Sequence, residues 1–257
     1  MMERLSRLEP VDALRLPEFT AGLESMHAMS QQELDAACLR MIDAISGMGP
    51  RAGEQQLVTT IESTPKALSG DLAFFRTLAL QLEHRSALFE GRTERNIQLA
   101  LQTNRFAGGW VDADQLCAAV CVHDIGMMFL PEGSWIGSER ISDGERQNIK
   151  EHVGWAAGLL SRMPGWEEAA RMVLQHHEKP DGSGYPHGLG GGEIVAGAKI
   201  LALVDAFESV MVKQGARGQA RSILRAVAEV NASDRQFDKS WVEPFNHAIR
   251  QMLETHA

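Results

Sequence analysis

The chain has 257 residues, of which 44% are hydrophobic and 23% charged, a composition typical of soluble globular proteins that excludes a disordered or fibrous chain. This length corresponds to one large domain, or to one domain with a helical extension. The net charge of −9, with a pI near 5.5, argues against nucleic acid as a partner, so a phosphate ligand needs local positive charge or a metal.

No apolar stretch is long enough to cross a bilayer, and the N-terminal residues lack the apolar core of a secretory signal. The three cysteines, Cys38, Cys117 and Cys121, are odd in number and form no CxxC pair, so we expect core thiols. These features predict a cytoplasmic protein without a membrane partner.

The first predicted element is a helix between Ser30 and Gly47, because apolar residues recur there on one face. A Gly- and Pro-rich stretch follows, and it predicts a boundary between an N-terminal helical extension (1–63) and the main domain (64–257). Three Ser-x-x-Glu capping boxes indicate helix starts, at Ser30, Ser142 and Ser240.

The remaining pattern is helical, and strand signals are nearly absent, so the sequence predicts an all-α fold. The expected helices cover about 69–88, 93–105, 113–123, 142–162, 165–177, 193–213, 217–230 and 240–255. Two loops separate them, one at about 126–140 and a glycine-rich one at 178–192.

Imidazole and carboxylate side chains occur at four places where predicted helices end or carry a buried apolar run. They are His123 with Asp124, His152, His176 with His177, and Asp205. An unpaired carboxylate such as Asp205 is costly to bury, so a cation or a metal is expected beside it. Imidazole and carboxylate together suit Mn, Fe or Zn, and the set predicts a multi-metal hydrolytic centre. Each histidine alone would be interpreted as a core or capping residue.

These residues belong to a longer ordered pattern. It reads His123-Asp124-Ile125-Gly126, then His152, then His176-His177-Glu178-x-x-Asp181-Gly182-x-Gly184-Tyr185-Pro186, and then Asp205-Ala206-Phe207. The pattern resembles the HD-GYP family of bacterial cyclic di-GMP phosphodiesterases, and the likeness runs from about Leu82 to Phe245. The first sixty or so residues resemble no sensor or receiver module.

The resemblance implies an HD-superfamily helical domain in which a metal-bridging hydroxide attacks the cyclic dinucleotide, giving pGpG or GMP. By this likeness Asp124 would bridge two metals. One metal would be held by His152, His176 and His177, and the other by His123 and Asp205. The metal would be Fe or Mn, with Zn and Ni as alternatives, at one or two per chain. Substrate contacts would come from the loop residues Asp181, Gly184, Tyr185 and Pro186.

The main departure from the family is Arg92, which stands where the family carries a metal-ligating histidine. Arginine is not deprotonated in proteins and cannot coordinate a metal. It also adds repulsion, because two unit charges 4 Å apart repel by roughly 4 kcal/mol at an effective dielectric of 20, and a divalent ion about doubles this. We therefore predict that Arg92, with Asp124, decides the catalytic behaviour, either by excluding a metal or by contacting phosphate itself.

Three smaller departures follow. Met127 replaces a lysine that the family carries after His-Asp-Ile-Gly, and the Arg-Pro-Tyr-like segment after the Asp205 position is absent. Leu88 stands where members with three metals carry glutamate, so no third metal is expected.

Two functions remain open from the sequence. One is a metal-dependent cyclic di-GMP phosphodiesterase, impaired to some degree. The other is a catalytically degenerate signalling module that binds cyclic di-GMP or a protein partner, such as a GGDEF-type protein. The Gly-Tyr-Pro string favours the first, and Arg92 with Met127 favours the second.

Overall fold

The computed structural model describes residues 70–130, 142–214, 219–233 and 235–256, together with Ala36 and Leu39. In these ranges the chain is helical, with a single isolated β-bridge between Asp181 and Gly190, so the predicted all-α fold is confirmed. Apart from Ala36 and Leu39, which are helical, the predicted helix over 30–47 and the boundary near residue 63 lie outside the described residues.

The helices mostly begin and end within a few residues of their predicted bounds. In chain order they are α5 (Gly70–Glu83), the 3₁₀ turn η3 (Ala87–Phe89), α6 (Arg92–Phe106), α7 (Ala113–Val122), the 3₁₀ turn η4 (Ile125–Phe129), α8 (Asp143–Lys150), α9 (His152–Leu160), α10 (Glu167–Gln175), α11 (Ala196–Gln214), α12 (Gln219–Ala232) and α13 (Lys239–His256).

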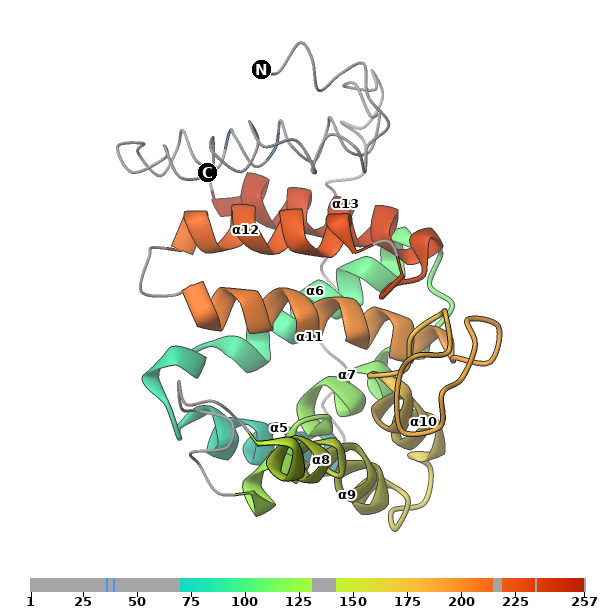
Figure 1. Cartoon of the computed structure of the whole chain (residues 1–257). Helices are drawn as coiled ribbons and strands as arrows, with labels where there is room; N and C mark the ends of the chain where they lie inside the picture. Colours follow the sequence, from blue (N-terminus) through green and yellow to red (C-terminus); the bar gives the residue numbers. More distant parts are fainter. Residues whose placement is uncertain are drawn as a thin grey trace.

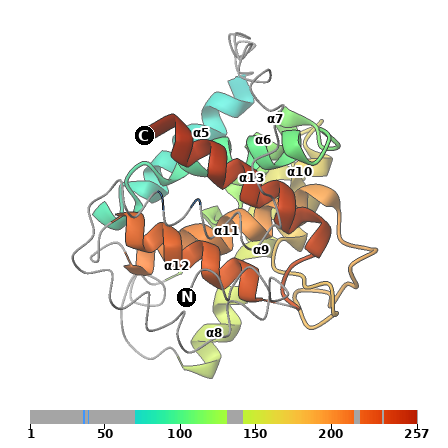
Figure 2. The same ribbon diagram turned by 90° about the horizontal axis from the view of Figure 1, so that it is seen from above.

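Helix α11 forms the centre of the domain, because its apolar side chains are buried on several faces, at Ile200, Leu201, Leu203 and Val204. It packs against α6, α7, α10, α12 and α13. Figure 1 shows α12 and α13 above α11 with the shorter helices below, and Figure 2 shows the same layers from above. None of the described helices combines the length and the apolar character needed to cross a membrane.

This arrangement brings the ends of several helices to one place beside α11. Each chemically interesting residue lies at such an end or on α11 itself: Arg92 begins α6, His123 and Asp124 follow α7, His152 begins α9, His176 and His177 follow α10, and Asp205 lies within α11. The fold thus brings residues that are distant in the sequence together in one cluster.

The single helix predicted over 142–162 is wrong, because the structure breaks it at Glu151 into α8 and α9. The backbone bonds at the break are of the tighter i to i+3 kind, from Glu151 N–H to Asn148 O and from Gly154 N–H to Glu151 O. The ring Nδ1 of His152 lies 2.6 Å from Ile149 O, which gives that carbonyl a side-chain partner. The break therefore orients His152.

The helix predicted over 69–88 is also too long, since α5 ends at Glu83 and a turn follows. Of the capping boxes, the one at Ser142 is present with both of its hydrogen bonds. The one at Ser240 is wrong, because α13 begins earlier and the carboxylate of Asp238 accepts the Ser240 N–H at 3.1 Å. The box at Ser30 lies outside the described residues.

The turn after α7 packs directly on the start of α9, and Gly126 makes this contact possible. A Cβ atom at Gly126 would lie 2.2 Å from the carbonyl oxygen of His152, far inside van der Waals contact. By contrast, a Cβ at Gly154, two residues further into α9, would meet no atom within 4 Å. Gly126 thus allows the close packing that places His152 beside Asp124.

Substituting Gly126→Ala should destabilise the protein by about 1–3 kcal/mol, because the new methyl group forces the turn away from α9. The matched change Gly154→Ala should be neutral or stabilising by up to about 1 kcal/mol, since a helical glycine is replaced without a clash. Urea unfolding of both variants measures this difference. Equal stability of the two would contradict the packing argument.

Candidate metal centre and adjoining cavity

Three histidines form a compact group in which one ring nitrogen of each lies within 4.8 Å of the others. They are His152, His176 and His177. Their rings contact each other directly, with centroids 4.0 Å apart for His176 and His177 and 5.2 Å apart for His152 and His177. The carboxylate of Asp124 adjoins the group, since its Oδ1 lies 3.7 Å from His152 Nε2. The three histidines therefore converge in the structure, with Asp124 beside one of them.

The donor atoms of this group are arranged as a metal requires. The Nδ1 atoms of His152 and His176 each lie 2.6 Å from a backbone carbonyl, at Ile149 and Val173. Such a carbonyl holds the proton on Nδ1, which leaves the lone pair on Nε2. Both Nε2 atoms are buried and have no hydrogen-bond partner. Burial lowers the pKa of His176, so this ring stays neutral, the form that coordinates a metal. The residues fit one divalent transition metal.

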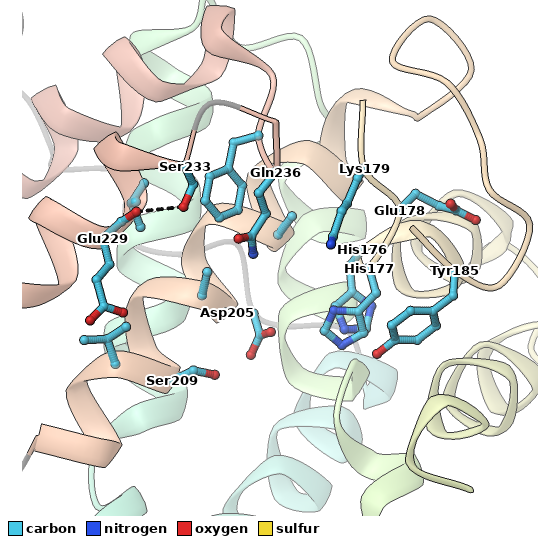
Figure 3. Close-up of a pocket in the computed structure, with 15 residues that line it drawn as sticks. His176, His177, Glu178, Lys179, Tyr185, Asp205, Ser209, Glu229, Ser233 and Gln236 are labelled. Atoms are coloured by element: carbon cyan, nitrogen blue, oxygen red, sulfur yellow. Dashed lines mark hydrogen bonds between the residues drawn. The ribbon is translucent and has the colours of Figure 1, made fainter. Parts of the chain in front are cut away.

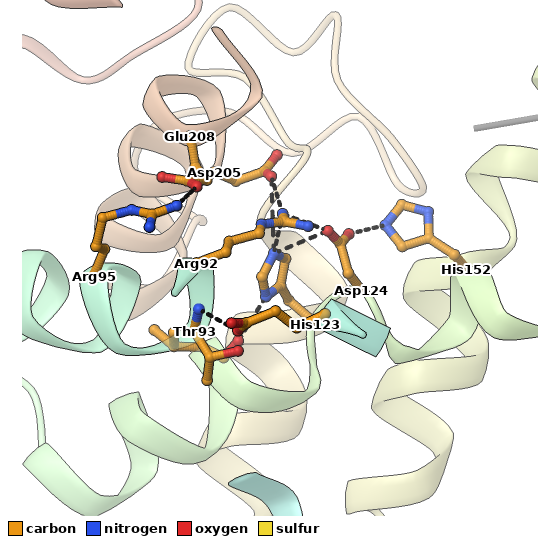
Figure 4. Close-up of polar contacts among 10 residues, drawn as sticks. Arg92, Thr93, Arg95, His123, Asp124, His152, Asp205 and Glu208 are labelled. Carbon is orange, nitrogen blue, oxygen red and sulfur yellow. Dashed lines mark hydrogen bonds and ion pairs between the residues drawn. The ribbon is translucent and has the colours of Figure 1, made fainter. Parts of the chain in front are cut away.

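The second candidate group, His123, Asp124 and Asp205, differs because Arg92 lies inside it. The Arg92 Nη2 atom donates to Asp124 Oδ2 at 2.6 Å and to Asp205 Oδ1 at 3.4 Å, and it lies 3.4 Å from His123 Nε2 (Figure 4). The guanidinium thus contacts all three groups that would ligate a second metal.

The charges in this second group balance without a metal. Burial would lower the pKa of His123, but Asp124 and Asp205 raise it to about 10, so the ring is protonated at neutral pH. Burial would raise the pKa of Asp124, but His123 and Arg92 hold it well below its usual range. Two cations therefore face two carboxylates.

The position of Arg92 is fixed by neighbours on both sides. The Glu83 carboxylate, at the end of α5, accepts the backbone N–H of Gly91 and that of Thr93, the latter at 3.0 Å. Glu83 thereby caps the N-terminus of α6, which satisfies free N–H groups and complements the helix dipole. One turn further along α6, Arg95 pairs at 2.5 Å with Glu208, a buried carboxylate on α11. The first turn of α6 is therefore tied to α5 and to α11.

A cavity of about 290 Å³ opens beside His176 and His177 and extends between α11 and the end of α12 (Figure 3). Its wall includes Asp205 and Tyr185 near the histidines. The rest is lined by Glu178, Lys179, Ala202, Ala206, Ser209, Val210, Glu229, Val230, Ser233, Gln236 and Phe237. The cavity is thus the space from which a ligand can reach the histidines.

The glycine-rich loop is organised by Glu178, a buried carboxylate to which the sequence analysis gave no role. It accepts the backbone N–H groups of His187, Gly188 and Leu189 at 2.6, 3.1 and 2.9 Å. Gly184 is needed for the same packing, because a Cβ there would lie 2.4 Å from the Glu178 backbone. The position of Glu178 directly after the two histidines was the feature of the sequence that could have identified it.

Of the four predicted substrate-binding residues, only Tyr185 lies on the cavity wall. Its ring stacks on His177 with centroids 4.9 Å apart and an interplanar angle of 30°. Asp181 is exposed and accepts the Ser183 N–H at 3.0 Å. Gly184 and Pro186 shape the loop that carries the tyrosine. Lys179 directly follows Glu178 in the sequence, but the sequence does not show that it lies on the cavity wall. Ser209 and Gln236 also line the cavity, and their distance from the histidines along the chain gives no signal of this.

The cysteines and the remaining histidines behave as structural residues where they are described. Cys117 and Cys121 are free thiols, and burial raises their pKa to about 11 and about 12, which makes them unreactive. His84 and His187 are exposed, and neither belongs to the two candidate groups. Cys38 and His27 lie outside the described residues.

Comparison with known proteins agrees with this geometry. The HD domain family matches residues 76–241, more than half of the chain. A cyclic di-GMP phosphodiesterase of Thermotoga maritima is 31% identical over 141 residues, which cover 54% of this chain and 38% of the relative. A 3'3'-cGAMP-specific phosphodiesterase 3 of Vibrio cholerae is 30% identical over 119 residues, covering 46% of this chain and 26% of the relative.

A third relative, the cyclic di-GMP phosphodiesterase response regulator RpfG of Xanthomonas campestris, is 33% identical over 95 residues, covering 36% of this chain and 25% of the relative. The chain thus aligns with between a quarter and two fifths of the length of these relatives. The family match, the relatives and the Gly-Tyr-Pro string agree, and the chain belongs to the HD domain family, in its HD-GYP group.

Proposed function

We propose that this chain is a degenerate HD-GYP protein that binds one divalent metal and a cyclic dinucleotide of the cyclic di-GMP class, and hydrolyses it slowly or not at all. The observation that carries the proposal is the Arg92 guanidinium among His123, Asp124 and Asp205. The names of the relatives support the ligand class, because all three act on cyclic di-GMP or 3'3'-cGAMP.

The metal would be held by His152, His176 and His177, with Asp124 Oδ1 at the edge of the group. The mixed imidazole and carboxylate donors favour Fe or Mn, with Zn and Ni as alternatives. When bound, the ion supplies Lewis-acid polarisation of a phosphoryl oxygen. The histidines orient their lone pairs toward it through the backbone carbonyls that hold their Nδ1 protons.

Slow hydrolysis is expected because Arg92 takes the place of the second metal. Two-metal hydrolytic sites hold the attacking and the leaving oxygen with separate ions. Here Asp124 and Asp205 are already paired with the Arg92 guanidinium, which carries a fixed positive charge. A second ion would be repelled by this charge, and arginine offers it no ligand atom. The chain therefore keeps His152, His176 and His177 for one metal, and the cavity beside them for the cyclic dinucleotide.

The second candidate function is the active two-metal phosphodiesterase. It is supported by the complete set of the other ligands and by the activities for which the relatives are named. It requires the Arg92 side chain to leave two buried carboxylates, which is costly. A signalling protein such as a GGDEF-type partner, and a cytoplasmic location, remain predictions from the sequence.

Protein loaded with Mn²⁺ or Fe²⁺ under anaerobic conditions should contain about one ion per chain, because the Arg92 guanidinium lies within the second candidate group. His176→Ala should abolish binding, while His187→Ala, which changes an exposed histidine, should leave it intact. Metal content by inductively coupled plasma mass spectrometry checks both. About two ions per unmodified chain would contradict the proposal.

Substituting Arg92→His should raise the metal content toward two ions and increase cyclic di-GMP hydrolysis by at least about tenfold, since a second ion stabilises transition-state charge by several kcal/mol. We expect the gain to be limited, because Met127 replaces the lysine that the family carries after His-Asp-Ile-Gly. The control Arg92→Met removes the cation but supplies no ligand, so it should gain less activity than the histidine variant. Chromatography of pGpG and GMP follows the reaction. Hydrolysis by the unmodified protein at the rate of Arg92→His would show that the chain is an active enzyme.

A further inference from the structure

Among the residues that the structure describes, one lysine or arginine lies on the wall of the cavity beside the histidines, namely Lys179. It follows the two histidines and Glu178 directly in the sequence. Figure 3 shows its side chain pointing into the cavity, on the same side as His177 and Tyr185. The chain as a whole is negative, at −9, so an anionic ligand that enters the cavity depends on this local charge.

The ammonium group of Lys179 forms no ion pair with a carboxylate in the described part of the chain. None of the ion pairs among the described residues includes it. The pKa of Asp181, two residues away, is lowered mainly by its hydrogen bonds with Ser183 and only slightly by the charge of Lys179. Lys179 is half-buried, so its charge is only partly screened by water.

Three other cations near the cavity have partners of their own. Arg92 is held by two carboxylates. Lys150 lies over the ring of Tyr185, with its ammonium 5.4 Å from the centroid. Arg225 pairs at 2.5 Å with Glu229, whose carboxylate borders the far end of the cavity. Arg235 is exposed and is not part of the cavity wall, although its neighbour Gln236 is. Among the residues that the structure describes, Lys179 is therefore the cation on the wall that is available to a ligand.

The size and lining of the cavity limit what fits. About 290 Å³ lies at the lower end of the range for small-molecule sites, so the space suits part of a cyclic dinucleotide. The wall away from the histidines carries polar groups suited to a base or sugar edge, at Ser209 and Gln236. A ligand whose base or sugar contacts Ser209 and Gln236 would have its phosphodiester between these residues and the histidines.

On this basis we propose that Lys179 binds a phosphodiester group of the cyclic dinucleotide while one of its two nucleotide halves occupies the cavity. The inference rests on the proposed function and names the residue that anchors the ligand. It transfers to Lys179 the phosphate contact that the sequence analysis considered for Arg92, because the guanidinium of Arg92 is held by Asp124 and Asp205.

Isothermal titration of cyclic di-GMP into the metal-loaded protein tests this. Lys179→Gln should weaken binding at least about tenfold, the loss expected for a charge-assisted hydrogen bond. The matched control is Lys239→Gln, which makes the same charge change at an exposed lysine that is not on the cavity wall. The control should bind as the unmodified protein does. Both variants should keep the metal content and the unfolding temperature of the unmodified protein.

Binding by Lys179→Gln within about twofold of the unmodified protein would overturn the inference and leave the proposed function standing. Loss of metal from this variant would also overturn it, since the lysine would then act through the metal site. If the unmodified protein does not bind cyclic di-GMP, the proposed function itself fails. A further expected result is a weaker dependence of the variant's Kd on added salt, because the screened charge is gone.

Discussion

Arg92 reaches the carboxylates of Asp124 and Asp205 because Glu83 caps the first turn of α6 and fixes where that helix begins. Charges this deeply buried are stable only when they are paired, and removing one partner leaves a costly unpaired charge. Here Arg92 and a protonated His123 balance the two carboxylates. The group that would hold a second metal is therefore complete as an ionic cluster, and its own electrostatics resist replacement of the guanidinium by an ion.

Asp124 links this cluster to the histidine group. Its Oδ2 receives the Arg92 hydrogen bond, while its Oδ1 faces His152 at 3.7 Å. The histidines depend on the backbone around them, because His152 is positioned by the break between α8 and α9 and by the close packing at Gly126. The same carboxylate thus faces the Arg92 cation with one oxygen and His152 of the histidine group with the other. This asymmetry explains how one chain can keep a metal site and lose the second.

Much of this could be predicted from the sequence, because helical periodicity and an ordered ligand pattern depend on local spacing. The fold class, most helix positions and the convergence of His152, His176 and His177 followed from it. The break at Glu151 could not be foreseen, since the residues at that point, Lys150 and Glu151, are ordinary helix formers. The direction of the Arg92 side chain and the presence of Lys179 on the cavity wall depend on tertiary packing. No local pattern encodes either of them.

The central claim is that Arg92 occupies the place of a second metal. A crystal structure of the protein grown with excess Mn²⁺, with anomalous diffraction data, tests it most directly. The account predicts one anomalous peak per chain, beside His152, His176 and His177, with the Arg92 guanidinium in contact with Asp124 and Asp205. Two peaks, with the second between His123 and Asp205 and the Arg92 side chain turned away, would contradict it.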